Sequence, residues 1–131
     1  MGLDNGICIK RNEKSMEIYD KLKCFEESWD TKHEFDFEIV YWSKCWNVRN
    51  KIAEAIGGIY DCGDTSITRD QIPKIINKLQ SFNKKNWEDC GGSIWTYDEQ
   101  KPLIKQQIKD LEYLYQLMDK YDLDIYFYDS Y

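Results

Sequence analysis

The sequence predicts an α+β fold in which a small, mostly antiparallel sheet packs against three or four helices. Two patterns support this prediction: short segments in which apolar residues alternate, as in strands, and longer segments in which they recur every three or four residues, as in helices. The chain has 131 residues, an ordinary length for one domain, and no linker, internal repeat or low-complexity segment divides it. Residues 1–131 are therefore expected to form a single domain.

The first two expected elements are a strand and a short helix. Residues 3–10 predict the strand, because Ile7 and Ile9 lie on one of its faces and Cys8 lies on the other. After a polar loop, residues 16–29 carry apolar side chains at helical spacing and predict the helix.

A second strand and a longer helix are expected next. Residues 35–39 alternate strictly between apolar and acidic side chains, as in a strand. The helix is expected to begin directly afterwards, near residues 37–40, and to end at Gly57 and Gly58, because glycine commonly ends helices. Its apolar face comprises Tyr41, Cys45, Val48, Ile52 and Ile56.

The second half of the chain predicts a loop and short strand over residues 59–68, followed by a helix. The sequence from Thr68 to Gln71 has the form of a capping box, and the helix that it opens is expected to end near Phe82. The buried face of this helix comprises Ile72, Ile75, Ile76 and Leu79.

An irregular stretch, the longest helix and a last strand complete the expected fold. Residues 83–97 form the irregular stretch, Asp98 opens the helix, and residues 123–128 form a terminal strand rich in aromatic residues. The apolar stripe of this helix comprises Ile104, Ile108, Leu111, Tyr115 and Met118, widened by Leu114.

The negative charge of the chain is concentrated in one segment. The formal net charge is −6, and residues 17–38 hold eight acids against three lysines. Direct binding of duplex nucleic acid is disfavoured, because phosphate binding needs clustered Lys and Arg. Two interpretations stay open: a solvated surface, or an acidic face that docks on a basic surface of a partner protein. The acids proposed for this face are Glu26, Glu27 and Asp30.

The sequence gives no pattern for a catalytic or metal site. Its five cysteines include no CxxC pair, and His33 is the single histidine, whereas zinc sites need closely spaced ligand pairs. His33 is expected on the surface, and the cysteines are expected as free, mostly buried thiols. Cys62 and Cys90 adjoin glycines in loops, where a reactive thiol could lie. Asp61 and Asp64 are interpreted as turn formers, with cation binding as the alternative.

The most informative segment for binding is residues 41–49. On the expected helix, Trp42, Trp46 and Arg49 share one face, and two tryptophans beside an arginine can form a binding surface. The alternative is a helix that is buried on two sides. In a small-molecule hypothesis, aromatic side chains stack a nucleobase and cations bind its phosphates. The residues proposed for this are Trp42, Trp46, Trp95 and Tyr97, with Lys44 and Arg49.

Several short motifs occur in an order that resembles a known group of proteins. They are Met1-Gly2-Leu3-Asp4, Tyr41-Trp42-x-Lys44, Asp61-Cys62, Gly92-Ser93 with Tyr97-Asp98-Glu99, and Tyr126-Phe127-Tyr128. The chain is similar to a family of small uncharacterised phage, prophage and bacterial proteins that begin MGLD, carry a YWRK-like helix and end in an aromatic strand. Ser43 stands where arginine is common in that family. The resemblance implies an accessory protein of a mobile element in the bacterial cytosol, and it transfers no catalytic residue.

The expected function is binding rather than catalysis. We expect a phage or prophage accessory protein that inhibits a host antiphage defence system, in the manner of an anti-CRISPR protein, through an acidic, aromatic surface. The alternatives are a small-molecule binder that sequesters a signalling nucleotide and a small enzyme of unknown reaction. The expected partner is accordingly a host defence protein with a basic surface, or a small nucleotide, and the chain could form a homodimer.

No cofactor, metal or membrane contact is expected. The sequence has no apolar run near the ~20 residues of a membrane span, and its first residues lack a signal-peptide pattern.

Overall fold

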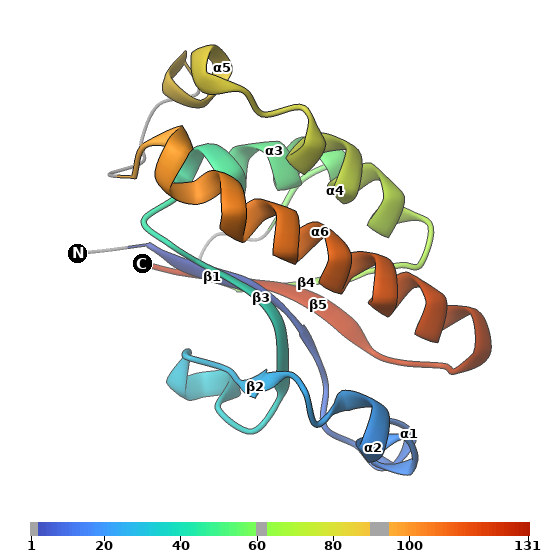
Figure 1. Ribbon diagram of the computed structural model, residues 1–131. Coiled ribbons are helices and arrows are strands. Elements are labelled where there is room, and N and C mark those ends of the chain that lie inside the picture. The colour runs from blue at the N-terminus through green and yellow to red at the C-terminus, as the bar shows by residue number, and fades with distance from the viewer. Residues whose placement is uncertain (1–2, 60–62, 90–94) are drawn as a thin grey trace.

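The computed structural model describes residues 3–59, 63–89 and 95–131. Within these ranges, one antiparallel sheet has the strand order β2-β3-β1-β5-β4 and carries its main helices on one face (Figure 1). The strands are β1 (Asp4–Ile9), β2 (Glu26–Glu27), β3 (Phe37–Ser43), β4 (Asp64–Ile67) and β5 (Ile125–Ser130). The predicted α+β class and the antiparallel sheet are thereby confirmed.

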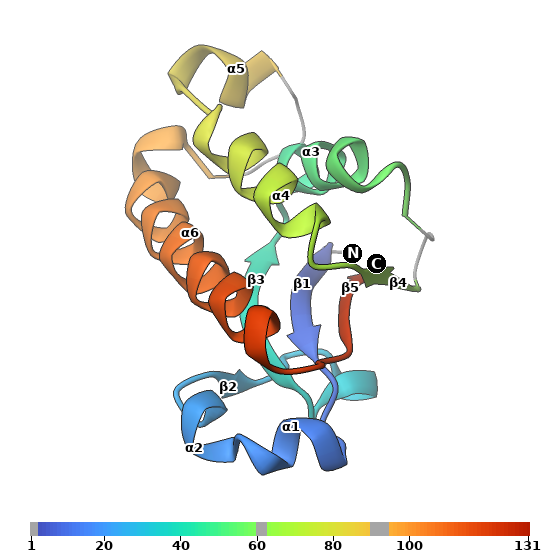
Figure 2. The same cartoon turned by 90° about the vertical axis from the view of Figure 1, so that its right-hand side faces the viewer.

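The helices lie on both faces of the sheet and at one end of it. Helices α3, α4 and α6 cover one face (Figures 1 and 2). Helices α1 and α2 lie at one end of the sheet, where Ile18 and Leu22 join the same core. The 3₁₀ helix η1 lies against the opposite face, where the His33 ring contacts those of Tyr126 and Tyr128. The helices are α1 (Glu13–Glu17), α2 (Tyr19–Leu22), the 3₁₀ helix η1 (Thr31–His33), α3 (Trp46–Ile56), α4 (Gln71–Gln80), α5 (Lys84–Asp89) and α6 (Tyr97–Lys120). Among the described residues, no helix is both long and apolar enough to cross a bilayer.

The central strand β1 pairs with β3 on one side and with β5 on the other. As predicted, Ile7 and Ile9 share one face: they belong to the main core beneath the helices. Cys8 lies on the opposite face, where it forms a second buried cluster with Tyr126 and Tyr128.

Gly6 fits β1 because no side chain has room there. An added Cβ would lie 2.6 Å from the Val40 carbonyl oxygen and 2.9 Å from the Tyr128 ring. The backbone of β3 and an aromatic side chain of β5 therefore occupy the space that any larger residue would need.

The predicted boundary between strand and helix near residues 37–40 is wrong. Strand β3 continues through Ser43, and α3 begins only at Trp46. Apolar spacing alone permits both structures, whereas pairing with β1 holds Tyr41 and Trp42 extended. The chain then turns at Lys44, whose φ of 58° lies in the left-handed region, and α3 ends at Gly57 as expected.

Two other segments and two helix ends differ from the predictions. Residues 16–29 hold no single helix, because α1 and α2 are short and separate and the chain then enters β2. The stretch over residues 83–97 was predicted as irregular but contains α5, and α4 ends at Gln80, slightly before the expected Phe82. The long helix α6 opens one residue early, with the Thr96 hydroxyl accepting a hydrogen bond from the Glu99 amide.

Candidate functional site

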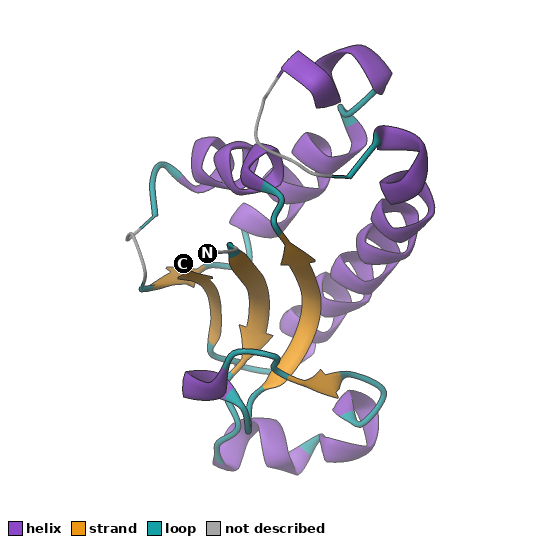
Figure 3. Ribbon diagram, turned by 90° about the vertical axis from the view of Figure 1, so that its left-hand side faces the viewer, coloured by secondary structure: helices purple, strands orange, loops and turns teal. Residues whose placement is uncertain are grey.

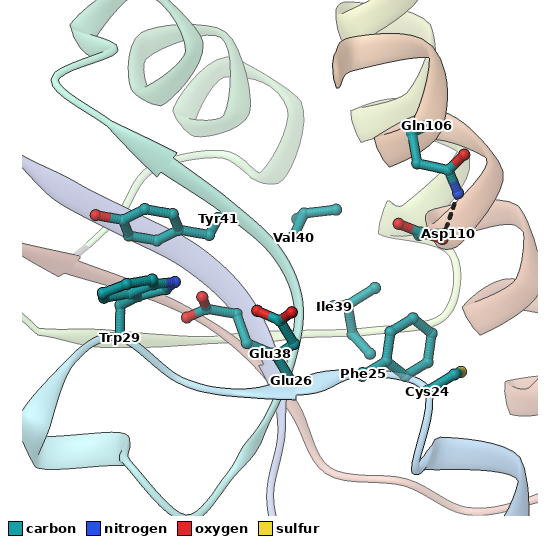
Figure 4. A pocket seen from close by; sticks show the side chains of 10 residues that line it. All are labelled: Cys24, Phe25, Glu26, Trp29, Glu38, Ile39, Val40, Tyr41, Gln106 and Asp110. Atoms are coloured by element: carbon teal, nitrogen blue, oxygen red, sulfur yellow. Dashed lines mark hydrogen bonds between the residues drawn. The ribbon is translucent and has the colours of Figure 1, made fainter. Parts of the chain in front are cut away.

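A groove of about 520 Å³ runs along the outer edge of β3, between α6 and the segment that carries β2 (Figure 4). We call it the β3 groove. Its described lining combines carboxylates, aromatic rings and aliphatic side chains, and it includes no Lys, Arg or His. The lining residues are Cys24, Phe25, Glu26, Trp29, Glu38, Ile39, Val40, Tyr41, Gln106 and Asp110.

The groove exists because β2 is much shorter than β3. Strand β2 pairs only with Phe37 and Glu38, and Figure 3 shows it beside one end of the long strand β3. In the described part of the chain, no strand covers this edge over residues 39–43. An uncovered strand edge presents backbone N–H and C=O groups that can pair with another chain.

Two backbone carbonyl groups of this edge accept hydrogen bonds from side chains of α6 and of the residues just before it. The Tyr41 carbonyl accepts a hydrogen bond from Gln107 Nε2 at 3.3 Å, and the Ser43 carbonyl accepts one from Trp95 Nε1 at 2.8 Å. In an antiparallel strand, the N–H and C=O of one residue point the same way. The backbone groups of Tyr41 and Ser43 therefore face away from β1.

An aromatic shelf forms one side of the β3 groove. The Trp29 side chain is 70% exposed and stacks on Tyr41 with ring centroids 6.0 Å apart and an interplanar angle of 27° (Figure 4). The Tyr41 hydroxyl donates to Asp4 Oδ1 at 2.6 Å. Burial, together with this bond to Asp4, raises the pKa of Tyr41 to about 12, so the phenol stays neutral and the shelf carries no charge of its own.

The carboxylates of the groove lie in different environments. Glu26 is exposed, whereas Glu38 is buried and accepts a hydrogen bond from the Tyr128 hydroxyl at 2.7 Å. Burial raises the pKa of Glu38, and hydrogen bonds offset part of that effect. Burial also raises the pKa of Asp110, whose carboxylate accepts a bond from Gln106 at 3.1 Å. A cation in the groove would favour the charged form of both groups.

His33 fixes the segment that carries the aromatic shelf. Its side chain is only 9% exposed, with Nε2 2.8 Å from a carboxylate oxygen of Asp64 and Nδ1 3.2 Å from Asp30 Oδ1. Its ring lies 5.0 Å from that of Tyr126 and 5.3 Å from that of Tyr128. The prediction of a surface histidine is therefore wrong, because two carboxylates and two tyrosine rings from separate parts of the chain enclose the imidazole.

The acids proposed from the sequence fall into two groups. Glu26 and Glu27 are exposed on β2 and can contact a partner. The Asp30 side chain is 11% exposed, accepts a hydrogen bond from the Lys32 amide at 2.9 Å at the start of η1, and contacts His33. Asp30 therefore stabilises the local fold. Asp64, interpreted as a turn former, lies in β4 instead.

The proposed face of Trp42, Trp46 and Arg49 is only partly present. Trp42 belongs to β3, is 2% exposed and donates from Nε1 to Gln107 Oε1 at 2.9 Å. Trp46 and Arg49 do lie together on α3, with the guanidinium 5.3 Å from the indole ring. Arg49 Nε also binds Asp129 at 2.8 Å. Because Trp42 belongs to the core, it cannot stack on a ligand at the surface.

The other residues of the nucleotide hypothesis lie around the start of α6. The indole of Trp95 binds the Ser43 carbonyl, and its own carbonyl accepts from Trp87 Nε1 at 2.7 Å. Tyr97 packs beside Trp87 at 6.2 Å, and Lys44 is exposed at the turn before α3. These contacts give Trp95 and Tyr97 a role in packing.

Sequence reasoning missed Cys24, Glu38 and Asp110 as residues of one groove. They come from the connection between α2 and β2, from β3 and from α6, and no spacing in the sequence indicates that these segments meet. Of the described cysteines, Cys8 and Cys45 are buried as expected and Cys24 is exposed. The predictions for Asp61, Cys62 and Cys90 concern positions outside the described residues.

Within the described ranges, no group of three His, Cys, Asp or Glu side chains is placed to hold a metal ion. Comparison with protein-family models, curated proteins and solved structures found no match.

Proposed function

We propose that the protein acts by binding, and that the β3 groove receives a basic segment of a partner protein. The observation that carries this proposal is the composition of the groove: three carboxylates and three aromatic rings, with no cationic side chain in its described lining. An Arg or Lys side chain there would gain Coulombic attraction and a cation–π contact worth about 0.5–1 kcal/mol on an exposed ring. The exposed Glu27, next to Glu26 on β2, extends the negative surface beyond the groove.

The biological role that fits this chemistry is inhibition of a host antiphage defence protein by a phage or prophage accessory protein. Proteins that handle nucleic acid carry clustered Lys and Arg for the phosphate backbone. An acidic, aromatic protein that covers such a cluster competes with the nucleic acid for the same surface.

The alternative, sequestration of a small nucleotide, has weaker support. It relied on four aromatic residues acting together, and Trp42 is buried in the core. Trp46 and Arg49 lie together on α3, but Arg49 binds the Asp129 carboxylate. That carboxylate repels a phosphate group.

The experiment that tests the proposed function measures binding of a fluorescein-labelled peptide of alternating Arg and Val by fluorescence anisotropy. Trp29→Ala and Glu26→Lys should each weaken binding by roughly fivefold, which corresponds to about 1 kcal/mol. Glu17→Lys is the matched control, because it makes the same charge change at an exposed position on α1. Equal losses in Glu26→Lys and Glu17→Lys would show general charge attraction and overturn the assignment to the groove.

A further inference from the structure

We propose that the partner segment binds as an added β-strand on the open edge of β3, with an arginine side chain over Trp29. This inference rests on the proposed function and specifies its geometry. Peptides commonly add a strand to an exposed sheet edge, where main-chain hydrogen bonds give affinity and alternate side-chain pockets give specificity.

The place of the added strand follows from the position of β2. Strand β2 covers β3 only at Phe37 and Glu38, and the β3 groove extends past this pairing to Ile39, Val40 and Tyr41. A partner strand in the groove would therefore continue the line of β2 along the same edge. Figure 4 shows the two walls that would flank it: the Trp29 side below the sheet and the α6 side with Gln106 and Asp110.

Tyr41 supplies the central backbone pair for this strand. Its carbonyl faces the groove and accepts a bond of 3.3 Å from Gln107, near the long end of the hydrogen-bond range. A backbone amide of the partner can replace this side-chain amide. Gln107 Oε1 still accepts its hydrogen bond from Trp42 Nε1. The shorter bond of 2.8 Å from Trp95 to Ser43 ends the available edge, so the added strand is short.

The two walls select different side chains, because successive residues of a strand point to opposite faces. On one side, the exposed Trp29 ring stacked on Tyr41 lies near the Glu26 and Glu38 carboxylates. A guanidinium can stack on an indole ring and donate to a carboxylate at once, which favours arginine over lysine there. A second copy of this chain fits poorly, because the groove lining that it would bring to the contact holds carboxylates and, in its described part, no Lys, Arg or His to place over Trp29.

The test uses the same Arg–Val peptide in two backbone-methylated forms, one with N-methyl groups on the Val residues and the other with them on the Arg residues. Neither form changes the charge or the side chains. A strand presents the N–H groups of alternate residues along one edge, so one form should bind at least tenfold more weakly and the other within about threefold of the parent. Hydrogen exchange should also show slower exchange of the Tyr41 amide in the complex.

The outcomes separate this inference from the proposed function. If the parent peptide binds and depends on Trp29 and Glu26, but the two methylated forms bind equally, strand addition is overturned and the basic-segment site stands. If the parent peptide does not bind, the proposed function itself fails. A dimer of the free protein with a protected Tyr41 amide would place a second copy on this edge and overturn the choice of partner.

Discussion

Replacing His33 by alanine tests how the wall of the β3 groove is held in place. The imidazole joins η1 to β4, because its two nitrogens lie 3.2 Å from Asp30 and 2.8 Å from Asp64. Carboxylates accept hydrogen bonds, and each ring nitrogen of His33 lies within hydrogen-bond distance of one. Trp29 lies only a few residues before His33 and depends on the same segment for its position.

The expected loss can be worked out from these contacts. A hydrogen bond to a charged group contributes about 1.5–3 kcal/mol, and the contact with Asp64 falls at or below the lower end because that side chain is 36% exposed. Loss of ring packing against Tyr126 and Tyr128 adds to this. His33→Ala should therefore lower the free energy of unfolding by roughly 2–4 kcal/mol, or the melting temperature by about 8–16 °C.

The assay is urea unfolding followed by circular dichroism, with Lys32→Ala as the matched control on an exposed neighbour. The control should change stability by less than about 0.5 kcal/mol. A double-mutant cycle with Asp64→Asn isolates the link between η1 and β4. A loss for His33→Ala below about 1 kcal/mol, or no coupling with Asp64, would refute the argument that this histidine fastens the segment to the sheet.

Three further predictions follow from buried or exposed groups. Burial raises the pKa of Glu38, so its contribution to stability is full below the ordinary pKa of a glutamate and is lost as pH rises through the folded value. Urea unfolding at pH 4 and pH 7 should therefore show Glu38→Gln gaining stability relative to the parent as pH rises, and a constant difference would contradict this. Gly6→Ala should cost about 2 kcal/mol or more, because its Cβ would lie 2.6 Å from the Val40 carbonyl oxygen. An unchanged melting temperature would mean that the β3 backbone shifts to make room for the methyl group at little cost. Cys24 is exposed and lines the groove, so bound peptide should slow its alkylation several-fold, as measured by mass spectrometry of the digested chain. An unchanged rate would place the peptide elsewhere.

The elements that depend on local periodicity could be predicted from the sequence. The alternation around Ile7 fits only a strand, and the spacing of Ile72, Ile75 and Leu79 fits only a helix. All four side chains are buried in the structure, as these patterns predict. The boundary after β3 could not be predicted, because Tyr41 belongs equally well to an apolar helix face and to a strand. Its pairing with a distant strand decides between them.

The candidate site was predictable only in part. The local excess of acids indicated that Glu26 and Glu27 face solvent, and they do. The groove itself needs β2 to stop early and α6 to pass beside β3, and both depend on the tertiary arrangement. The burial of His33 depends on Asp64, far along the chain, so no short-range pattern could reveal it.

The position of β1 in the sheet also governs the order in which the chain can fold during synthesis. Strand β1 pairs with β5 through residues 125–130. One edge of β1, which is synthesised early, therefore stays unpaired until β5, which is synthesised late, is available. Until β5 leaves the ribosome, β1 and β3 can form only a hairpin-like pair, and β4 has no partner in the described sheet. Pairings between distant segments form slowly, and an open edge invites wrong pairing. Until β5 is complete, the nascent chain therefore exposes unpaired strand edges of β1 and β4.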